Sequence, residues 1–193
     1  MASASPKKAD RPLRRDAQRN RERLLAAAVT ALLRDGHGVS MAKIAEEAGV
    51  GVGTLYRRYP SREHLLEDLQ RRSYQMVVDM LREVGAADCD GQECVRMFLT
   101  RTVEHGSQLV MTWHGAPPTR DPETLRLESE LHDRVAEMIK KGILDGSIRP
   151  GVTALDVIVF GAMIAQPFPT AEPMWPELTQ RQIANFLRGL APR

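Results

Sequence analysis

The sequence predicts an all-α protein of about nine helices, in which an N-terminal three-helix domain is followed by a larger helical domain. Apolar residues recur at spacings of three and four along most of the chain, which is the period of an amphipathic helix. Cap residues and glycine or proline breaks divide this pattern into segments of helical length. No stretch alternates convincingly between apolar and polar residues, so we predict no sheet.

The first helix is expected to begin near Asp16 and to end at the DGHG segment, residues 35–38. Leu24, Leu25 and Leu32 belong to its apolar stripe. Residues 1–15 are polar and basic and have nothing to bury, so we expect a disordered arm. Two interpretations of the arm stay open: a solvated tail, or a source of additional phosphate and minor-groove contacts.

Two short helices joined by a glycine turn are predicted next, and the first of them is capped by Ser40. Residues 49–51, GVG, form the turn, and the second helix covers 52–58 before Pro60 stops it. This is the layout of a helix-turn-helix, whose second helix enters the DNA major groove. We therefore predict a DNA-binding domain over residues 16–64, with the helix that starts at 61 leading into a second domain over 65–193.

The second short helix carries side chains that hydrogen-bond phosphates and base edges. Thr54 and Arg57 are the candidates for base contacts, because arginine can grip guanine at two positions. The remaining candidates are phosphate contacts or positions of close backbone approach. The predicted DNA-binding residues are Ser40, Gly51, Val52, Gly53, Thr54, Tyr56, Arg57, Arg58 and Arg62. An ordinary three-helix packing unit is the alternative, but it does not explain Tyr56 and two arginines on one short helix.

The second half of the chain is also predicted to be helical. Helices begin after the caps Asp90, Asp121 and Thr153, and a further helix covers 176–190. A short helix is expected over 108–113. The segment 157–165 is apolar almost all round, so both of its faces need to be covered, one of them by a partner.

Charge is unevenly placed along the chain. Residues 1–75 contain 15 Lys and Arg against 9 Asp and Glu, a net charge of +6, whereas residues 76–193 contain 12 against 16, a net charge of −4. A basic front and an acidic back indicate that the front alone meets a polyanion.

The stretches RERLLAAAVTALLRDG and SMAKIAEEAGVGVGTLYRRYPSREHLLEDL resemble the TetR family of bacterial transcriptional repressors. The family's signature is a helix ending in glycine, a Thr/Ser opening, IA-x-x-A-GV, and TLY followed by an aromatic residue and a cap. The resemblance covers about residues 18–70. This chain departs from many members by carrying Arg57, Arg58 and Pro60. The base sequence of its operator therefore cannot be inferred from that of a relative.

The resemblance implies a twofold homodimer that binds a near-palindromic operator, with half-sites roughly 34 Å apart or more. It also implies a small-molecule effector that releases the DNA. The expected dimer interface is formed by Val157, Phe160, Gly161, Ile164, Ile183, Phe186, Leu187 and Leu190. The expected ligand pocket is formed by Met97, Phe98, Met111, Trp113, His114, Met138, Phe160 and Met163. For each of these residues, ordinary packing in the core is the alternative.

Other classes of function find less support in the sequence. We find no phosphate-binding glycine loop, no sequence order typical of a catalytic triad and no spacing of metal ligands. Glu128 and His132 are four residues apart, but two residues are too few for a metal site. We therefore expect no enzyme activity, no cofactor and no membrane segment, and a cytoplasmic, nucleoid-associated bacterial protein. Two rivals stay open: an uncharacterised helical enzyme, and a non-sensing structural or interaction module whose basic front meets RNA, a membrane or an acidic protein. Cys89 and Cys94 are expected to be incidental thiols, with a thiol switch as the alternative, because a reducing cytosol disfavours disulfides.

Overall fold

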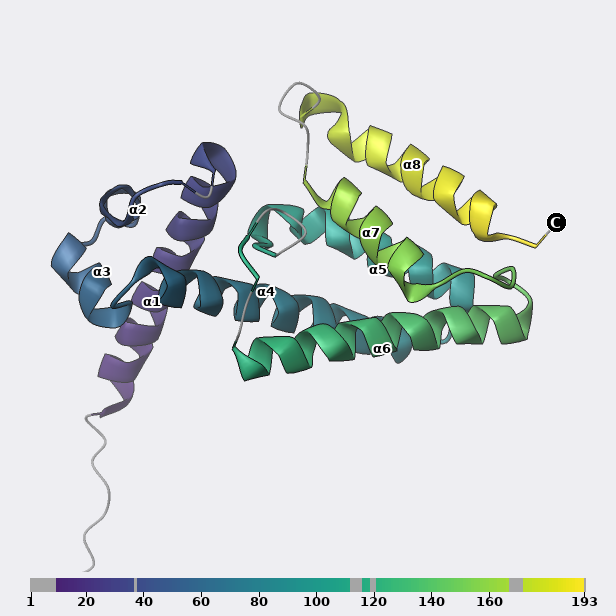
Figure 1. The fold of residues 1–193 in the computed structure, drawn as a ribbon, viewed down its shortest axis with the longest axis horizontal. Coiled ribbons are helices and arrows are strands. Elements are labelled where there is room, and N and C mark those ends of the chain that lie inside the picture. Colours follow the sequence, from purple (N-terminus) through teal and green to yellow (C-terminus); the bar gives the residue numbers. More distant parts are fainter. Residues whose placement is uncertain (1–9, 37, 112–115, 119–120, 167–171, 193) are drawn as a thin grey trace, which may run out of the picture. The chain divides into compact units, whose positions relative to one another are not determined.

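The computed structural model describes the backbone of residues 10–36, 38–111, 116–118, 121–166 and 172–192. Within these ranges it describes side chains from residue 21 onward, except the side chain of residue 172. Within these ranges the backbone forms eight α-helices and two short 3₁₀ helices, with no β-strand (Figure 1). The all-α prediction is confirmed. The chain divides into two compact units, Met1–Arg62 and Glu63–Arg193, which we call the N-terminal unit and the C-terminal unit.

Three helices make up the N-terminal unit: α1 (Asp10–Asp35), α2 (Met41–Glu47) and α3 (Val52–Arg58). The prediction for α1 was wrong at its start, because the helix begins six residues before Asp16 and includes part of the expected arm. Arginine, leucine and alanine favour helix in this stretch, and Pro12 lies in the first turn, where its missing N–H costs nothing. Residues 1–9 lie outside the described residues.

Helix α5 (Gly91–His105) is central to the C-terminal unit and packs against α6 (Pro122–Asp145), α7 (Ala154–Ala165) and α8 (Trp175–Leu190) (Figure 1). Helix α4 (Arg62–Gly85) begins at the division between the units. The core of this unit includes buried side chains from each of its helices, among them Val78, Leu99, Val135, Val157 and Ile183.

Side-chain caps fix the starts of three helices in the C-terminal unit, as the sequence predicted. Asp90 accepts a hydrogen bond from the Glu93 amide at 2.7 Å, and Asp121 accepts one from the Thr124 amide at 3.0 Å. Thr153 forms a reciprocal capping box at the start of α7. Each bond satisfies a backbone donor that the helix itself leaves without a partner.

Two expectations for the C-terminal unit were wrong. Where a helix was expected over 108–113, a 3₁₀ helix (Gly106–Gln108) is followed by extended backbone at Leu109, because the last turn of α5 tightens and ends there. Residues 112 and 113 lie outside the described residues. Cys89 and Cys94 are not two separate thiols but are joined by a disulfide. The two positions flank the cap of α5, which brings them together. None of the described helices combines the length and the apolar character that crossing a bilayer requires.

Candidate DNA-binding surface and interior cavity

The turn between α2 and α3 is a Schellman motif, which sets the direction in which α3 leaves. The Val50 amide donates to the carbonyl of Ala45 at 3.0 Å, and the Gly49 amide donates to that of Glu46 at 3.1 Å. Gly49 has φ of +65°, a left-handed conformation that glycine adopts without steric cost. The glycine turn predicted from the sequence is therefore present, and α3 starts at a fixed angle to α2.

Helix α3 has a single buried side chain. Leu55 is fully buried, while Val52 is 42 % and Tyr56 is 47 % exposed, and Thr54, Arg57 and Arg58 are exposed as well. A seven-residue helix is too short to be stable alone, so packing through Leu55 must hold it. The other positions of α3 are thus free to contact another molecule.

The two arginines of α3 already have neighbours on their own chain. Arg57 donates from Nη2 to Thr54 Oγ1 at 3.1 Å, which aligns the two predicted base-reading side chains one turn apart. The Arg58 guanidinium lies 5.9 Å from the ring centroid of Tyr59. Tyr59 is itself buried, so it packs inside the protein rather than adding to the exposed surface of α3.

Helix N-termini at Ser40 and Gly51 add backbone donors to this surface. Ser40 Oγ accepts a hydrogen bond from the Lys43 amide at 3.2 Å, so its own O–H can donate elsewhere. Gly51 is the N-cap of α3 and has no side chain to cover the first amides of that helix. Gly53 is exposed, and a Cβ placed on it would meet nothing within 4 Å.

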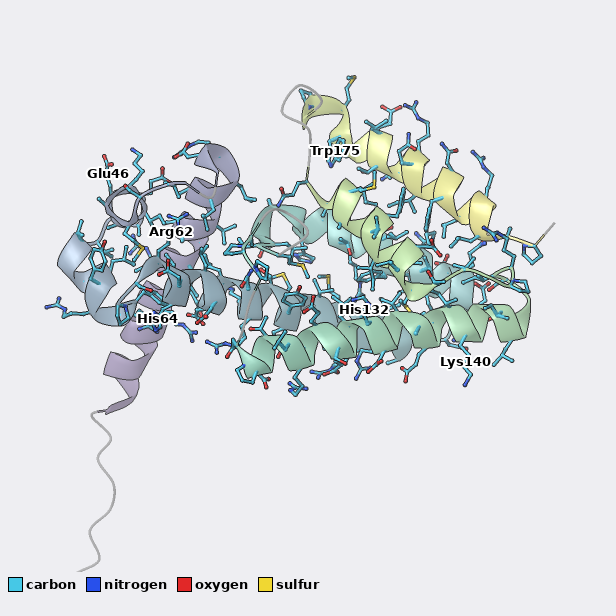
Figure 2. The ribbon with its side chains drawn as sticks, in the orientation of Figure 1. Glu46, Arg62, His64, His132, Lys140 and Trp175 are labelled. Atoms are coloured by element: carbon cyan, nitrogen blue, oxygen red, sulfur yellow. A yellow bond between two sulfur atoms is a disulfide. The ribbon has the colours of Figure 1, made fainter. Side chains whose placement is uncertain are left out.

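Arg62 lies differently from the other predicted phosphate contacts. Its guanidinium points into the N-terminal unit and donates from Nη1 to the carbonyl of Val39, in the loop between α1 and α2 (Figure 2). The side chain is only partly exposed. Arg62 therefore secures the loop that precedes Ser40, and its role in binding phosphate stays a prediction.

An ion-paired brace connects the C-terminal ends of α1 and α2. Arg34 donates from Nε to Asp35 Oδ1 at 2.8 Å and from Nη2 to Glu47 Oε1. The hydrogen bond from Arg34 lowers the pKa of Asp35, and its bonds to Asp35 and Glu47 raise the pKa of Arg34. The brace lies at the surface, where such pairs contribute little to stability.

An apolar cavity of about 30 Å³ lies inside the C-terminal unit. Phe98 and Met111 line it, and Thr102 contributes the one hydroxyl among the described lining residues, which donates to the Phe98 carbonyl at 2.9 Å. The volume matches about one water molecule, whereas drug-sized ligands need roughly 300 Å³ or more. A ligand would therefore have to displace side chains on entry.

The other predicted pocket residues lie elsewhere. Met138 is buried in the core, Met97 is partly buried against the core, and Phe160 stacks on Phe186, and these three residues are not among those that line the cavity. Met163 is 69 % exposed on α7 and is not among the residues that line this cavity. Trp113 and His114 lie outside the described residues.

Sequence reasoning missed most of the lining because small and aliphatic residues carry no pocket signature. The lining residues absent from the prediction are Val77, Thr102, Leu109, Leu131, Ile158, Gly161, Ala162 and Ala165. A signal that was available is the run of small residues on α7, which leaves space beside a helix.

Buried polar groups of α4 hold the segment that lines the cavity. Ser73 Oγ accepts a hydrogen bond from the Val110 amide at 2.9 Å, and Gln70 donates to the carbonyl of Pro117 at 2.6 Å. Both side chains are only 1 % exposed. Val110 lies between the lining residues Leu109 and Met111, so a shift of this segment would disturb α4 directly.

Most residues assigned to a dimer interface face the interior of their own chain. Val157, Ile164, Ile183, Leu187 and Leu190 are buried in the core, and a Cβ on Gly161 would lie 3.3 Å from Leu99 Cδ2. Only Phe160 and Phe186 remain partly exposed, with their rings stacked at 4.0 Å. Because α7 is apolar on all sides, its sequence could not show which face turns inward.

A different set of apolar side chains faces outward from α7. Leu155 is 52 % and Met163 is 69 % exposed, and Val159 between them is partly exposed. These residues follow the i, i+4, i+8 spacing of one helix face. We call Leu155, Val159 and Met163 the α7 stripe.

Comparisons with known proteins agree with this arrangement. Residues 24–69 match the family model described as bacterial regulatory proteins, tetR family. Over 64 residues the chain is 39 % identical to the HTH-type transcriptional repressor KstR of Mycolicibacterium smegmatis, a segment that makes up 32 % of this chain and 31 % of that repressor. The chain thus matches less than a third of the length of that relative.

Solved structures match over nearly the whole chain. A TetR transcription regulatory protein from Mycobacterium vanbaalenii is 25 % identical, with a TM-score of 0.61 over 94 % of this chain and 100 % of that one. The ketosteroid transcriptional regulator KstR2 of Mycobacterium tuberculosis has a TM-score of 0.71 over 91 % of this chain and 96 % of that one, at 19 % identity, which shows a shared fold.

Proposed function

This chain belongs to the TetR family of bacterial transcriptional regulators, and on that premise we propose that it is a cytoplasmic repressor that binds a near-palindromic operator as a homodimer and leaves it when an apolar effector binds. The observation that carries the proposal is α3, a helix that is anchored by Leu55 alone and exposes two arginines. It lies in a unit that contains 13 Lys and Arg against 6 Asp and Glu, a net charge of +7.

In the proposed complex, α3 enters the major groove and its exposed side chains divide between bases and phosphates. Arg57 reads a guanine, with Thr54 holding its guanidinium in position. Val52, which is exposed on the same helix, meets a thymine methyl group. The O–H of Ser40 and the amides at the start of α3 donate to phosphates. Steady contact with phosphates makes the affinity fall as salt is raised.

Arg57→Ala tests the assignment of α3. After operator selection from random duplexes with the full chain, the variant should lose about 1–3 kcal/mol of binding free energy and accept other bases at one position of each half-site. Lys140→Ala, which removes an exposed cation from α6, is the matched control and should bind like the parent chain. Gel-shift titrations at several salt concentrations measure both. Unchanged affinity and base preference in Arg57→Ala would show that α3 is not the reading helix.

A second copy of the chain is the proposed partner of the α7 stripe. Three outward apolar side chains beside the Phe160–Phe186 stack form a surface that water contacts unfavourably, and a twofold partner would cover it with its own copy. This surface replaces the buried residues first expected at the interface. Two reading heads per dimer then require a near-palindromic operator.

The effector is proposed to be an apolar small molecule, because among the described lining residues Thr102 alone offers a hydroxyl, and that hydroxyl is already bonded to the Phe98 carbonyl. Entry would push Leu109 and Met111 outward and strain the bonds that Ser73 and Gln70 make to their segment. Release follows only if the effector binds the DNA-free state more tightly than the DNA-bound state. In a thermal-shift screen, a compound of this kind should raise the Tm of the free protein and reduce the fraction of operator bound.

A further inference from the structure

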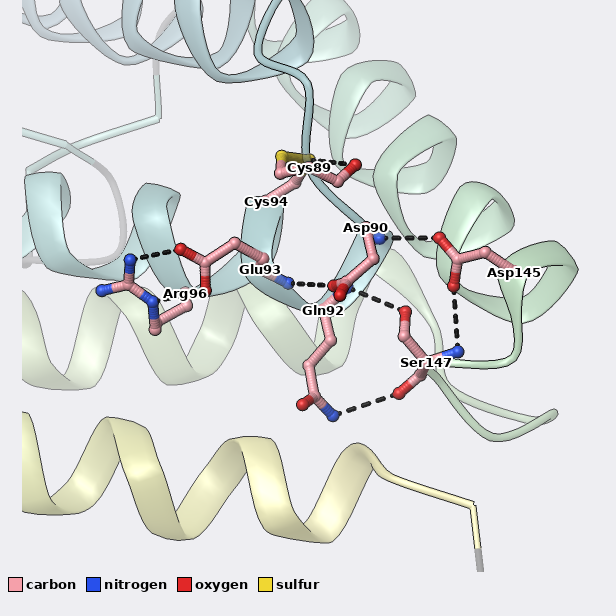
Figure 3. The surroundings of a disulfide bond; sticks show 9 residues. Cys89, Asp90, Gln92, Glu93, Cys94, Arg96, Asp145 and Ser147 are labelled. Atoms are coloured by element: carbon pink, nitrogen blue, oxygen red, sulfur yellow. Dashed lines mark hydrogen bonds and ion pairs between the residues drawn. A yellow bond between two sulfur atoms is a disulfide. The ribbon is translucent and has the colours of Figure 1, made fainter.

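The disulfide between Cys89 and Cys94 stands at the start of α5 (Figure 3). Cys89 directly precedes the N-cap Asp90, and Cys94 is the fourth residue of the helix. In many helices the residues at these two positions pack against each other as a hydrophobic staple. Their Cα atoms lie 6.2 Å apart, within the range that a disulfide spans. The bond is thus a covalent form of a packing contact that the helix start already favours.

We propose that Cys89 and Cys94 are a reversible redox modification site, oxidised by a low-molecular-weight disulfide and reduced by a small thiol. Oxidation forms the bond between the two sulfurs and breaks the S–S bond of the oxidant. The protein loses two electrons, and its two thiol protons end on the two small thiols that are released. Reduction is the reverse exchange. The site is additional to the proposed DNA binding and does not depend on it.

The two sulfurs are accessible to different degrees, which gives the exchange a direction. Cys94 is 1 % exposed, whereas Cys89 is partly exposed, so an incoming thiolate attacks the sulfur of Cys89. Cys94 is then the leaving group. It leaves within the first turns of α5, where the positive end of the helix dipole favours an anion.

The bond secures a junction of three helices. The Gly91 amide donates to Asp145 Oδ2 at 2.9 Å, and the Gln92 amide donates to Ser147 Oγ at 3.1 Å. The Gln92 side chain donates to the carbonyl of Leu187 at 3.0 Å. The first turn of α5 therefore holds the end of α6, the turn after it and α8. The disulfide links Cys89 and Cys94, which lie on either side of the first turn of α5. It therefore restricts the conformations in which these hydrogen bonds are broken more than the one in which they are formed.

Counting thiols tests reversibility. The full chain is equilibrated in mixtures of reduced and oxidised glutathione, quenched with acid, and alkylated after denaturation. Mass spectrometry then counts the alkyl adducts on each molecule. We expect molecules with two adducts or none, with a transition between them, and one adduct only in the Cys89→Ser and Cys94→Ser variants. Two adducts in fully oxidised glutathione, a lasting glutathione adduct, or no adducts after native treatment with dithiothreitol would each overturn the proposal.

Amide hydrogen exchange tests the role of the junction. Reduction should speed exchange at Gly91, Gln92 and Ser147 by roughly tenfold, because the helix start opens more often. The double variant Cys89→Ser/Cys94→Ser should exchange at one rate in both buffers. Equal rates in both states of the parent chain would overturn the role, as would an equal acceleration in α3. Neither readout involves DNA, so failure here is distinct from failure of the proposed function.

Discussion

Glycine serves the two units of this protein in different ways. In the N-terminal unit Gly36 and Gly49 have φ of +77° and +65°, and each ends a helix by turning the chain. In the C-terminal unit Gly91 and Gly106 allow helix backbones to touch, because a Cβ on either would overlap backbone atoms of Gly142 or Ala165. Gly146 also ends a helix, α6, with φ of +79°, so both units use glycine to end helices, but only the C-terminal unit also uses it to bring backbones together.

Gly91→Ala should be the most damaging change. The added methyl group has only the backbone of α6 to push against, so we expect a loss of about 3 kcal/mol or more in the free energy of unfolding. Urea unfolding followed by tryptophan fluorescence measures it, since both tryptophans, Trp113 and Trp175, belong to the C-terminal unit. Gly189→Ala, where a Cβ meets nothing within 4 Å, is the control and should be neutral or stabilising.

The same substitution at Gly53 should have the opposite character. Its Cβ would meet nothing in the protein, so folding is preserved and the helix gains up to about 1 kcal/mol of propensity. If DNA approaches this position closely, the methyl group is expected to weaken operator binding roughly tenfold through a loss of about 1–2 kcal/mol of contact. Circular dichroism and gel shift separate the two effects. Tight binding by a stable Gly53→Ala variant would argue against close approach.

The α7 stripe gives the next test, because the proposed dimer surface lies in the C-terminal unit. Met163→Glu should yield monomers and weaken operator binding by about 10²-fold, since two linked reading heads gain from each other's proximity. Sedimentation velocity and gel shift measure these effects. Leu144→Glu, at a side chain that is 79 % exposed on α6, is the matched control and should remain dimeric. A dimeric Met163→Glu would place the interface elsewhere.

Acid should destabilise the C-terminal unit more than the N-terminal unit, and we expect this difference to be smaller than the effects of the substitutions. Hydrogen bonds lower the pKa of six described carboxyl groups in the C-terminal unit but of Asp35 alone in the N-terminal unit; the six are Glu93, Asp121, Glu123, Glu130, Asp145 and Asp156.

A lowered pKa in the folded state contributes stability above the ordinary pKa, and that stability disappears as pH falls through the lowered value. Below about pH 4 the C-terminal unit should therefore lose stability faster than the N-terminal unit. Tryptophan fluorescence reports the first, and amide exchange in α2 and α3 reports the second. Earlier loss of protection in α2 and α3 would contradict this.

Local signals in the sequence were sufficient wherever the structure is decided locally. Ser40, Asp90, Asp121 and Thr153 cap helices as predicted, because a cap depends on residues three positions away. The ends of α2 and α3 followed for the same reason. The layout of the helix-turn-helix is thus predictable from its amino-acid sequence alone.

Signals failed where tertiary packing decides. The period of α7 could not show whether Ile164 or Met163 faces the core, since both are apolar and only the position of α5 distinguishes them. The cavity is formed by aliphatic residues that elsewhere fill space. Cys89 and Cys94 were expected to be incidental thiols because the cytosol is reducing. That argument concerns the cell compartment and says nothing about the distance between the two residues.

The dependence of α3 on one leucine has a consequence for how such proteins diversify. Six of the seven residues of this helix contribute no buried side chain, so exchanging them leaves the scaffold intact. A descendant gene can therefore change the exposed residues of this helix without unfolding it, and under the proposed function such surface changes alone would give a new operator sequence.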